Sequence, residues 1–245
     1  MIGLGGAEFR LPLLIMLFGF VALQAVILNK ALSLVVVAAA LPARLGAVPL
    51  STLLPHWSVV ANLLLGSLAG AWAGASWATR MRTATLYRVL AALLALIALA
   101  LIGNHAGALH HVDLVPVVVL IAGVIAGFCI GVVAAIMGVA GGELLIPTIV
   151  LLFGTDIKVA GSLSLMVSLP TMLVAFARYS RDGSFTVLRR HAQLATVLAA
   201  GSIAGAILGG LLLGVVPAAV LVPGLALLLI LSSVKVWRHA TPEQA

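Results

Sequence analysis

The chain has 245 residues, of which 64% are hydrophobic and only 8% charged. Thirteen Lys and Arg and six Asp and Glu residues cannot cover the surface of a soluble domain of this size, so the composition excludes a soluble globular enzyme. The net charge is +7, and the basic residues that produce it lie in short connections between apolar runs, not in a stripe interleaved with aromatic residues. This arrangement argues against nucleic-acid binding. The composition is that of a polytopic membrane protein.

The apolar runs predict an all-α transmembrane bundle, because open strands cannot satisfy their backbone groups in lipid. The segment 143–155 is too short to cross a bilayer untilted, so we expect a half-helix there. In chain order the predicted segments are 11–28, 31–49, 57–79, 84–103, 113–137, 143–155, 158–178, 191–214 and 217–237.

The distribution of Lys and Arg predicts the orientation in the membrane. If each later segment crosses the membrane once, one of the two possible orientations places ten cations on the cytoplasmic side, including Lys30 and the carboxy-terminal Lys235 and Arg238. Only Arg10, Arg44 and Lys158 then fall outside. We therefore expect a multi-pass inner-membrane protein with an outward amino terminus and a cytoplasmic carboxy terminus.

A shift of 135 residues reveals an internal repeat. The stretch "GLGGAEFRLPLLIMLFG" at 3–19 lies over "GVAGGELLIPTIVLLFG" at 138–154, and "GSLAGAWAG" at 66–74 lies over "GSIAGAILG" at 201–209. These matches divide one transmembrane domain, 1–245, into repeat 1 at 1–103 and repeat 2 at 113–240. The predicted crossings make the two repeats inverted, which is a recurrent plan of secondary transporters.

Each glycine-rich stretch interrupts an apolar run with a carboxylate and a proline. In inverted-repeat transporters such breaks expose backbone N–H groups to an anionic substrate between the halves. The alternative is that the glycines only form tight turns, with each glutamate capping a helix start. Repeat 1 has no counterpart of segment 113–137, so either a helix is missing or the true start lies upstream of Met1.

At these residues the chain resembles the sulfite exporter TauE/SafE family of bacterial inner-membrane proteins. Each half of that family has a glycine-rich break, a proline-bearing helix and then a "KvAvxTSL"-like helix start, matched here by "KVAGSLSL" at 158–165 and more weakly by "NKALSL" at 29–34. Ala7 and Ala140 replace glycines, and Leu163 replaces a frequent threonine. The resemblance implies export of sulfite or a small organosulfonate-type anion.

The candidate site is built from the two breaks and the polar residues near them, because ionisable groups within a membrane segment are costly unless they have a function. We expect backbone N–H groups of the breaks and the hydroxyl groups of Ser33 and Ser164 to hold the anion. Lys30 and Lys158 are expected at helix ends, either as cations that reach the interface or as entrance charges. The candidate substrate-binding residues are Gly3, Gly6, Glu8, Arg10, Lys30, Ser33, Gly138, Gly141, Gly142, Glu143, Lys158 and Ser164.

Two further patterns have simpler interpretations. Ladders of glycine at Gly66, Gly70 and Gly74, and at Gly201, Gly205 and Gly209, predict close helix packing. Ser164, Ser168 and Thr171 share a helix face that we expect to look into the bundle.

A metal or cofactor site is not expected. The single cysteine, Cys129, excludes a thiolate cluster. His105, His110 and His111 near Asp113 form at most a weak metal site on a loop, since adjacent loop histidines more often bind nothing.

An enzyme is the rival of a different class, but the chain contains neither "HExxH" nor "GxSxG". An anion channel is the closer rival, since a pore can use the same glycine breaks. Proton coupling through Glu8 or Glu143 is a further hypothesis that rests only on their depth. No catalytic residue, cofactor or nucleic acid is expected, the partners are a small sulfur anion and the bilayer, and a homodimer is left open.

Overall fold

The computed structural model describes residues 6–47, 49–105, 115–212 and 218–239, and all of its regular elements in these ranges are helical. The all-α prediction is therefore confirmed for the described residues. The elements are α1 (Ala7–Met16), α2 (Ala22–Ala47), α3 (Leu50–Leu53), η1 (Leu54–His56), α4 (Trp57–Arg80), α5 (Thr83–His105), α6 (Pro116–Met137), α7 (Gly142–Phe153), α8 (Ile157–Tyr179), η2 (Gly183–Thr186), α9 (Val187–Arg190), α10 (Ala192–Leu212) and α11 (Ala218–His239).

Four stretches of the described chain are long and apolar enough to cross a membrane: 22–41, 50–80, 116–137 and 157–179. The most apolar of them is α6. Its start follows from Pro116, whose ring fixes a helical φ at a position that needs no N–H donor. The start of α8 is fixed by Asp156, whose Oδ1 accepts a hydrogen bond from the Lys158 N–H at 2.8 Å.

The predicted boundary between the first two segments is wrong. We expected separate spans at 11–28 and 31–49, whereas α1 ends at Met16 and α2 runs unbroken from Ala22 to Ala47. The break lies instead at 17–21, where Gly19 has a φ of 67°. That stretch is apolar apart from the glycine, so its hydropathy does not distinguish it from a helix. Lys30 consequently lies within α2, not at a helix end.

Two short helices follow left-handed glycines at positions that the repeat aligns. Gly6 (φ 67°) precedes α1 and Gly141 (φ 80°) precedes α7, while Gly19 and Gly154, at φ 67° and 62°, follow the two helices. A side chain is strained in this region of φ, which explains glycine at these places. The 12 residues of α7 span roughly 18 Å. The expected half-helix at 143–155 therefore has the predicted length.

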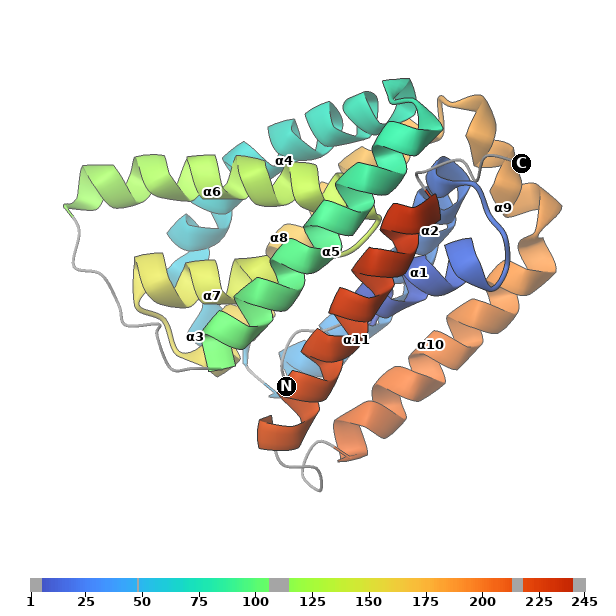
Figure 1. Cartoon of the computed structure of the whole chain (residues 1–245). Coiled ribbons are helices and arrows are strands. Elements are labelled where there is room, and N and C mark those ends of the chain that lie inside the picture. The colour runs from blue at the N-terminus through green and yellow to red at the C-terminus, as the bar shows by residue number, and fades with distance from the viewer. Residues whose placement is uncertain (1–5, 48, 106–114, 213–217, 240–245) are drawn as a thin grey trace.

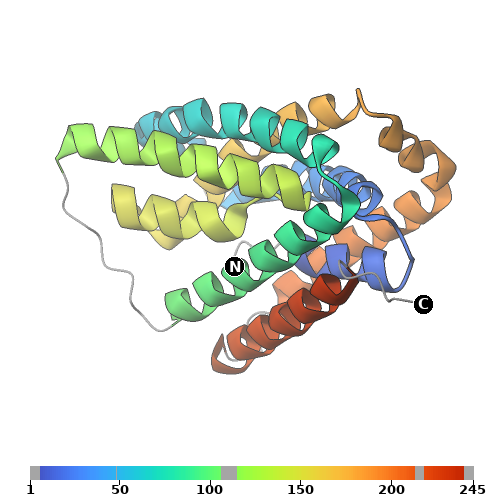
Figure 2. The same cartoon turned by 45° about the horizontal axis from the view of Figure 1, so that its top comes forward.

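The first glycine ladder packs α4 against α6. The two helices lie side by side in both views of the fold (Figures 1 and 2), and a Cβ added to Gly66 or Gly70 would collide with the backbone of α6 at Val124 or Phe128. The packing prediction for this ladder is confirmed. It is wrong for Gly201 and Gly205 of α10, where an added Cβ would meet no atom within 4 Å among the described residues. For Gly209 the structure does not describe the surroundings, so the prediction for this residue is not tested.

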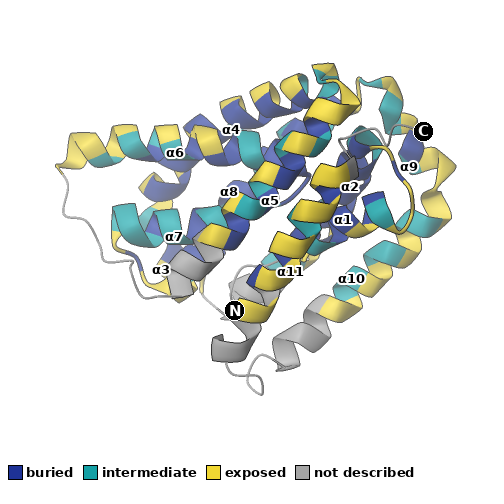
Figure 3. Ribbon diagram, viewed as in Figure 1, coloured by how far each residue is buried: buried dark blue, intermediate teal, exposed yellow. Residues whose placement is uncertain are grey.

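Burial distinguishes the interior of the bundle from its outer faces (Figure 3). Ser164, Ser168 and Thr171 are all buried, as predicted for the inward face of α8. Thr171 also links two helices, because its Oγ1 lies 2.8 Å from the Oγ of Ser67 on α4. Exposed apolar side chains such as Ile121 and Ile125 cover the outside of α6, as expected for a surface in contact with lipid.

Most of the basic segments that connect or end the helices lie at one end of the bundle. The α4–α5 turn, the 180–191 connection and the carboxyl end of α11 all lie there (Figure 1). Near this end Arg178 joins α8 to α4, since its Nε donates to Ser76 Oγ at 2.8 Å and its guanidinium lies 6.0 Å from the centre of the Trp72 ring. The other basic residues in or beside these segments are Arg80, Arg82, Arg88, Arg181, Arg189, Arg190, Lys235 and Arg238.

A candidate anion site at the helix breaks

The carboxyl end of α6 lies inside the bundle, where water cannot satisfy its last carbonyl groups. Lys30 of α2 binds one carbonyl of the last turn and one just beyond the helix: its Nζ donates to Ala134 O and to Val139 O, both at 2.8 Å. The hydroxyl of Tyr179, at the end of α8, donates to Ala135 O at 3.0 Å. Side chains from two other helices therefore hold the end of α6.

The buried position of Lys30 corrects a second prediction. Its side chain is fully buried, so it neither reaches the membrane interface nor serves as an entrance charge. Its assignment to the cytoplasmic side was also wrong. The physical reason is the continuity of α2, which places Lys30 in the third turn of a long helix beside the carboxyl end of α6.

Asn29, the residue before Lys30, connects both breaks. Its Nδ2 donates to Ala7 O at the start of α1 (3.0 Å) and to Met137 O at the end of α6 (3.1 Å). Its Oδ1 accepts from Arg10 Nε at 2.9 Å. One amide group thus fixes α1 relative to α6 and brings the two glycine motifs together, through a bond between residues that are 108 positions apart in sequence.

Arg10 on α1 is a guanidinium held by neutral groups. It is 8% exposed, and besides Asn29 it donates to Ser33 Oγ at 2.7 Å and to Ser202 Oγ of α10 at 2.8 Å. A buried cation normally requires an anionic partner, because desolvation is costly. The side chain lies within the bundle, so its assignment to the outer side by counting was wrong.

Two carboxyl groups at aligned positions of the repeat meet beside this cation. Glu8 on α1 is hydrogen-bonded to Glu143 on α7, and its carboxyl also accepts from its own backbone N–H. Glu8 is 1% exposed, and its Oε2 is buried without a hydrogen-bond partner. Each glutamate lies in the first turn of its helix, where a carboxylate interacts favourably with the helix dipole.

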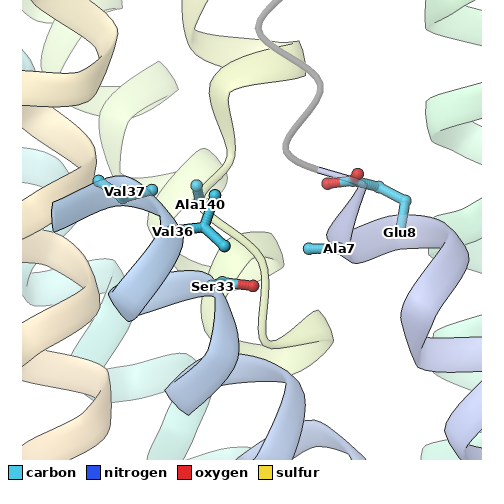
Figure 4. Close-up of a pocket in the computed structure, with 6 residues that line it drawn as sticks. All are labelled: Ala7, Glu8, Ser33, Val36, Val37 and Ala140. Carbon is cyan, nitrogen blue, oxygen red and sulfur yellow. The ribbon is translucent and has the colours of Figure 1, made fainter. Parts of the chain in front are cut away.

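A small cavity opens between α1 and α2 at this point (Figure 4). Its polar walls are Glu8 and Ser33, and its apolar walls are Ala7, Val36, Val37 and Ala140. Ala7 and Glu8 face the three α2 side chains, with Ala140 of the second break beside Val36. The volume is about 10 Å³, enough for about one water molecule.

The remaining predicted residues are distributed around this centre. Gly138, with a φ of 71°, packs against the backbone of α2 at Val26 and Lys30, and Gly141 faces Ala134 and Ile130 of α6. Gly142 is buried at the start of α7. Ser164 is buried but donates to Gly161 O of its own helix at 2.9 Å, and it does not line the cavity. Lys158 is exposed at the start of α8. Gly3 lies outside the described residues.

Sequence reasoning missed Asn29 and Ser202. Asn29 is a polar residue inside an apolar run, and such residues in a membrane segment predict an interior or functional position. Ser202 follows Gly201 in the second glycine ladder, where a serine is also typical of helix packing. Among the described residues no group of three metal-binding side chains occurs. His110, His111 and Asp113 of the weak metal hypothesis lie outside the described residues.

Replacing Lys30 with methionine is expected to destabilise the protein by about 1–3 kcal/mol, because it leaves the buried carbonyl of Val139 unsatisfied, whereas Ala134 O keeps the N–H of Val139. Lys158→Met is the matched control, since that side chain is exposed. Unfolding of the two variants in detergent measures the difference. Equal stabilities would show that the amine of Lys30 does not hold the end of α6.

The family model of the sulfite exporter TauE/SafE family matches residues 1–101. The match covers α1 to α4 and most of α5, and hence the first break, Arg10, Asn29, Lys30 and Ser33. The resemblance expected from the sequence is confirmed over that region. The second break and α7 lie beyond it. No curated protein and no solved structure matches the chain.

Proposed function

We propose that this protein is a secondary transporter that exports sulfite or a small organosulfonate anion across the bacterial inner membrane by alternating access. The observation that carries the proposal is Arg10, a buried guanidinium whose four hydrogen bonds all go to neutral acceptors. The family match over residues 1–101 supports membrane transport of sulfite-like anions, and it argues against an enzyme.

The charges around the cavity favour an anionic substrate. Two cations, Arg10 and Lys30, are buried there, and a hydrogen-bonded pair of carboxyl groups that shares one proton carries one negative charge. With both basic groups ionised, the group has one positive charge in excess. A monovalent sulfur anion neutralises that charge, and its oxygens can accept from Arg10 and from Ser33, which already bonds to Arg10. The first turns of α1 and α7 add N–H donors from two directions.

The directions of α1 and α7 support the inverted-repeat plan. Both helices begin at the paired carboxyl groups. Just beyond the end of α1, Phe20 packs edge-on against His191 in the basic 180–191 connection, with ring centres 5.0 Å apart. At the end of α7, Phe153 lies instead close to Gly123 in the amino-terminal part of α6. The basic end of the bundle is then the cytoplasmic side, with the carboxy terminus inside.

The cavity size favours a carrier over a channel. A volume of about 10 Å³ accommodates about one water molecule, and a sulfur anion with three oxygens is larger. The anion can enter only if α1 and α2 separate from the break, which is the movement that alternating access requires. An open pore would need a continuous polar path. The apolar walls at Val36 and Val37 suit the hydrocarbon part of a sulfonate.

Binding to purified protein tests this proposal, with sulfite, methanesulfonate, sulfate and chloride as the panel. We expect sulfite and methanesulfonate to bind more tightly than chloride. Ser33→Ala should lower their affinity by about 2- to 12-fold, since a hydrogen bond contributes about 0.5–1.5 kcal/mol. Ser164→Ala should lower it less, because Ser164 already donates within its own helix. Failure of every sulfur anion to bind would contradict the proposal.

A further inference from the structure

We propose that Glu8 and Glu143 form a single proton-binding site that is coupled to anion binding in the adjacent cavity. The inference rests on the proposed function and adds the ion that accompanies the substrate. The geometry carries it, because the buried carboxyl of Glu8 lines the cavity and contacts the carboxyl of Glu143 from the other half of the chain.

A hydrogen bond between two carboxyl groups contains a proton. An ionised carboxylate only accepts, so one member of the pair must be protonated to donate. Two carboxylates in contact do not both ionise at the same pH, since their charges repel at short range. The paired arrangement therefore binds one proton between α1 and α7.

The pair also faces the cavity. Glu8 lines it, and the Oε2 of Glu8 is buried without a partner. Figure 4 shows the Glu8 carboxyl on the α1 side of the cavity, opposite the α2 residues. A substrate anion in the cavity lies close to this carboxyl, so a second negative charge on the pair opposes anion binding. The anion and the proton consequently favour each other's binding, and by linkage the effect is reciprocal.

Few other charges act on the pair. Arg10 lies two residues away on α1 and acts on the Glu8 carboxyl, while the charged residues of α2 are the buried Lys30 and, near the end of the helix, Arg44. Helices α6 and α10 contain no charged residue. The charged residues of α5, α8 and α11 are within six residues of a helix end: Arg88, Lys158, Arg178, Lys235 and Arg238. The coupling between anion and proton is therefore dominated by the carboxyl pair and Arg10.

Separation of α1 from α7 gives the proton a route. Movement between the halves breaks the bond between the carboxyl groups and exposes them to water on one side of the membrane. The bound proton then exchanges with that side, and re-formation of the pair requires a proton again. Each anion transported is accompanied by the binding of one proton.

The direct test is titration calorimetry of purified protein with sulfite and, separately, with methanesulfonate, in two buffers of different ionisation enthalpy. We expect a proton uptake per anion that rises from near zero, where the pair already holds its shared proton, towards one at higher pH, and an affinity that falls as pH rises. Glu8→Gln and Glu143→Gln should each abolish the uptake and flatten the pH dependence. Glu243→Gln is the matched control, since it changes a carboxylate near the carboxy terminus.

The outcomes separate the two proposals. Anion binding without proton uptake overturns the proton site and leaves the transporter proposal standing. Absence of anion binding contradicts the transporter proposal. The proton site is then tested separately, by infrared spectroscopy of the protein without substrate. A protonated-carboxyl band that disappears in both single glutamine variants supports the shared proton. A band that persists unchanged in both variants overturns it.

Discussion

Replacement of Gly138 with alanine is expected to destabilise the protein by about 2–5 kcal/mol. The glycine has a φ of 71°, and an added Cβ would collide with the carbonyl oxygen of Val26 on α2. Left-handed backbone costs a residue with a side chain roughly 1–2 kcal/mol, and overpacking against a rigid neighbour adds about 1–3 kcal/mol. Because Val26 lies within α2, its carbonyl cannot move without disturbing the helix that carries Asn29 and Lys30.

Gly6→Ala separates these two contributions. Gly6 has nearly the same φ, 67°, but an added Cβ there meets no described atom within 4 Å. We expect this variant to lose only the backbone contribution, roughly 1–2 kcal/mol. Chemical unfolding of both variants in the same detergent gives the comparison. Equal losses would show that the close approach of α2 to the break does not contribute to stability.

Replacement of Arg10 with methionine is expected to weaken sulfite binding by roughly 10- to 150-fold, since a hydrogen bond to a charged group contributes about 1.5–3 kcal/mol. Arg10→Lys keeps the charge but loses the planar fork that reaches Asn29, Ser33 and Ser202, so an intermediate affinity is expected. Arg178→Met is the matched control, because this arginine is also partly buried but bonds to Ser76 and Thr79 at the basic end of the bundle. Wild-type affinity in a folded Arg10→Met protein would exclude the guanidinium from the site.

Much of the fold is predictable because membrane helices leave a strong hydropathy signal. The predicted segment 57–79 begins with α4 and ends one residue before it does. The predicted segment 158–178 is one residue shorter than α8 at each end. The short α7 was also expected, since its glycine start and its length are both visible in the sequence. Hydropathy gives the wrong prediction at 17–30. The break at 17–21 is apolar, so it is taken for part of a helix, and Lys30 is charged, so it is taken for part of a connection between helices although it is buried within α2.

The contacts of the candidate site are harder to predict. The sequence indicates that Lys30 and Arg10 are unusual, but their partners lie far away: Ala134 is 104 residues from Lys30, and Ser202 is 192 residues from Arg10. The aligned positions of Glu8 and Glu143 are visible in the repeat, but their hydrogen bond is not. The open face at Gly201 and Gly205 was missed for a related reason, since a glycine ladder predicts packing without specifying the helix that packs on it.

Counterflow in proteoliposomes tests the central claim most directly. Vesicles loaded with unlabelled sulfite are diluted into a trace of labelled sulfite under reducing conditions, with the membrane potential clamped to zero. A carrier exchanges the two, so we predict transient accumulation of label above its external concentration, and loss of this accumulation in Arg10→Met but not in Arg178→Met. Conductance that follows the membrane potential, without accumulation of label, would contradict alternating access and favour an anion channel.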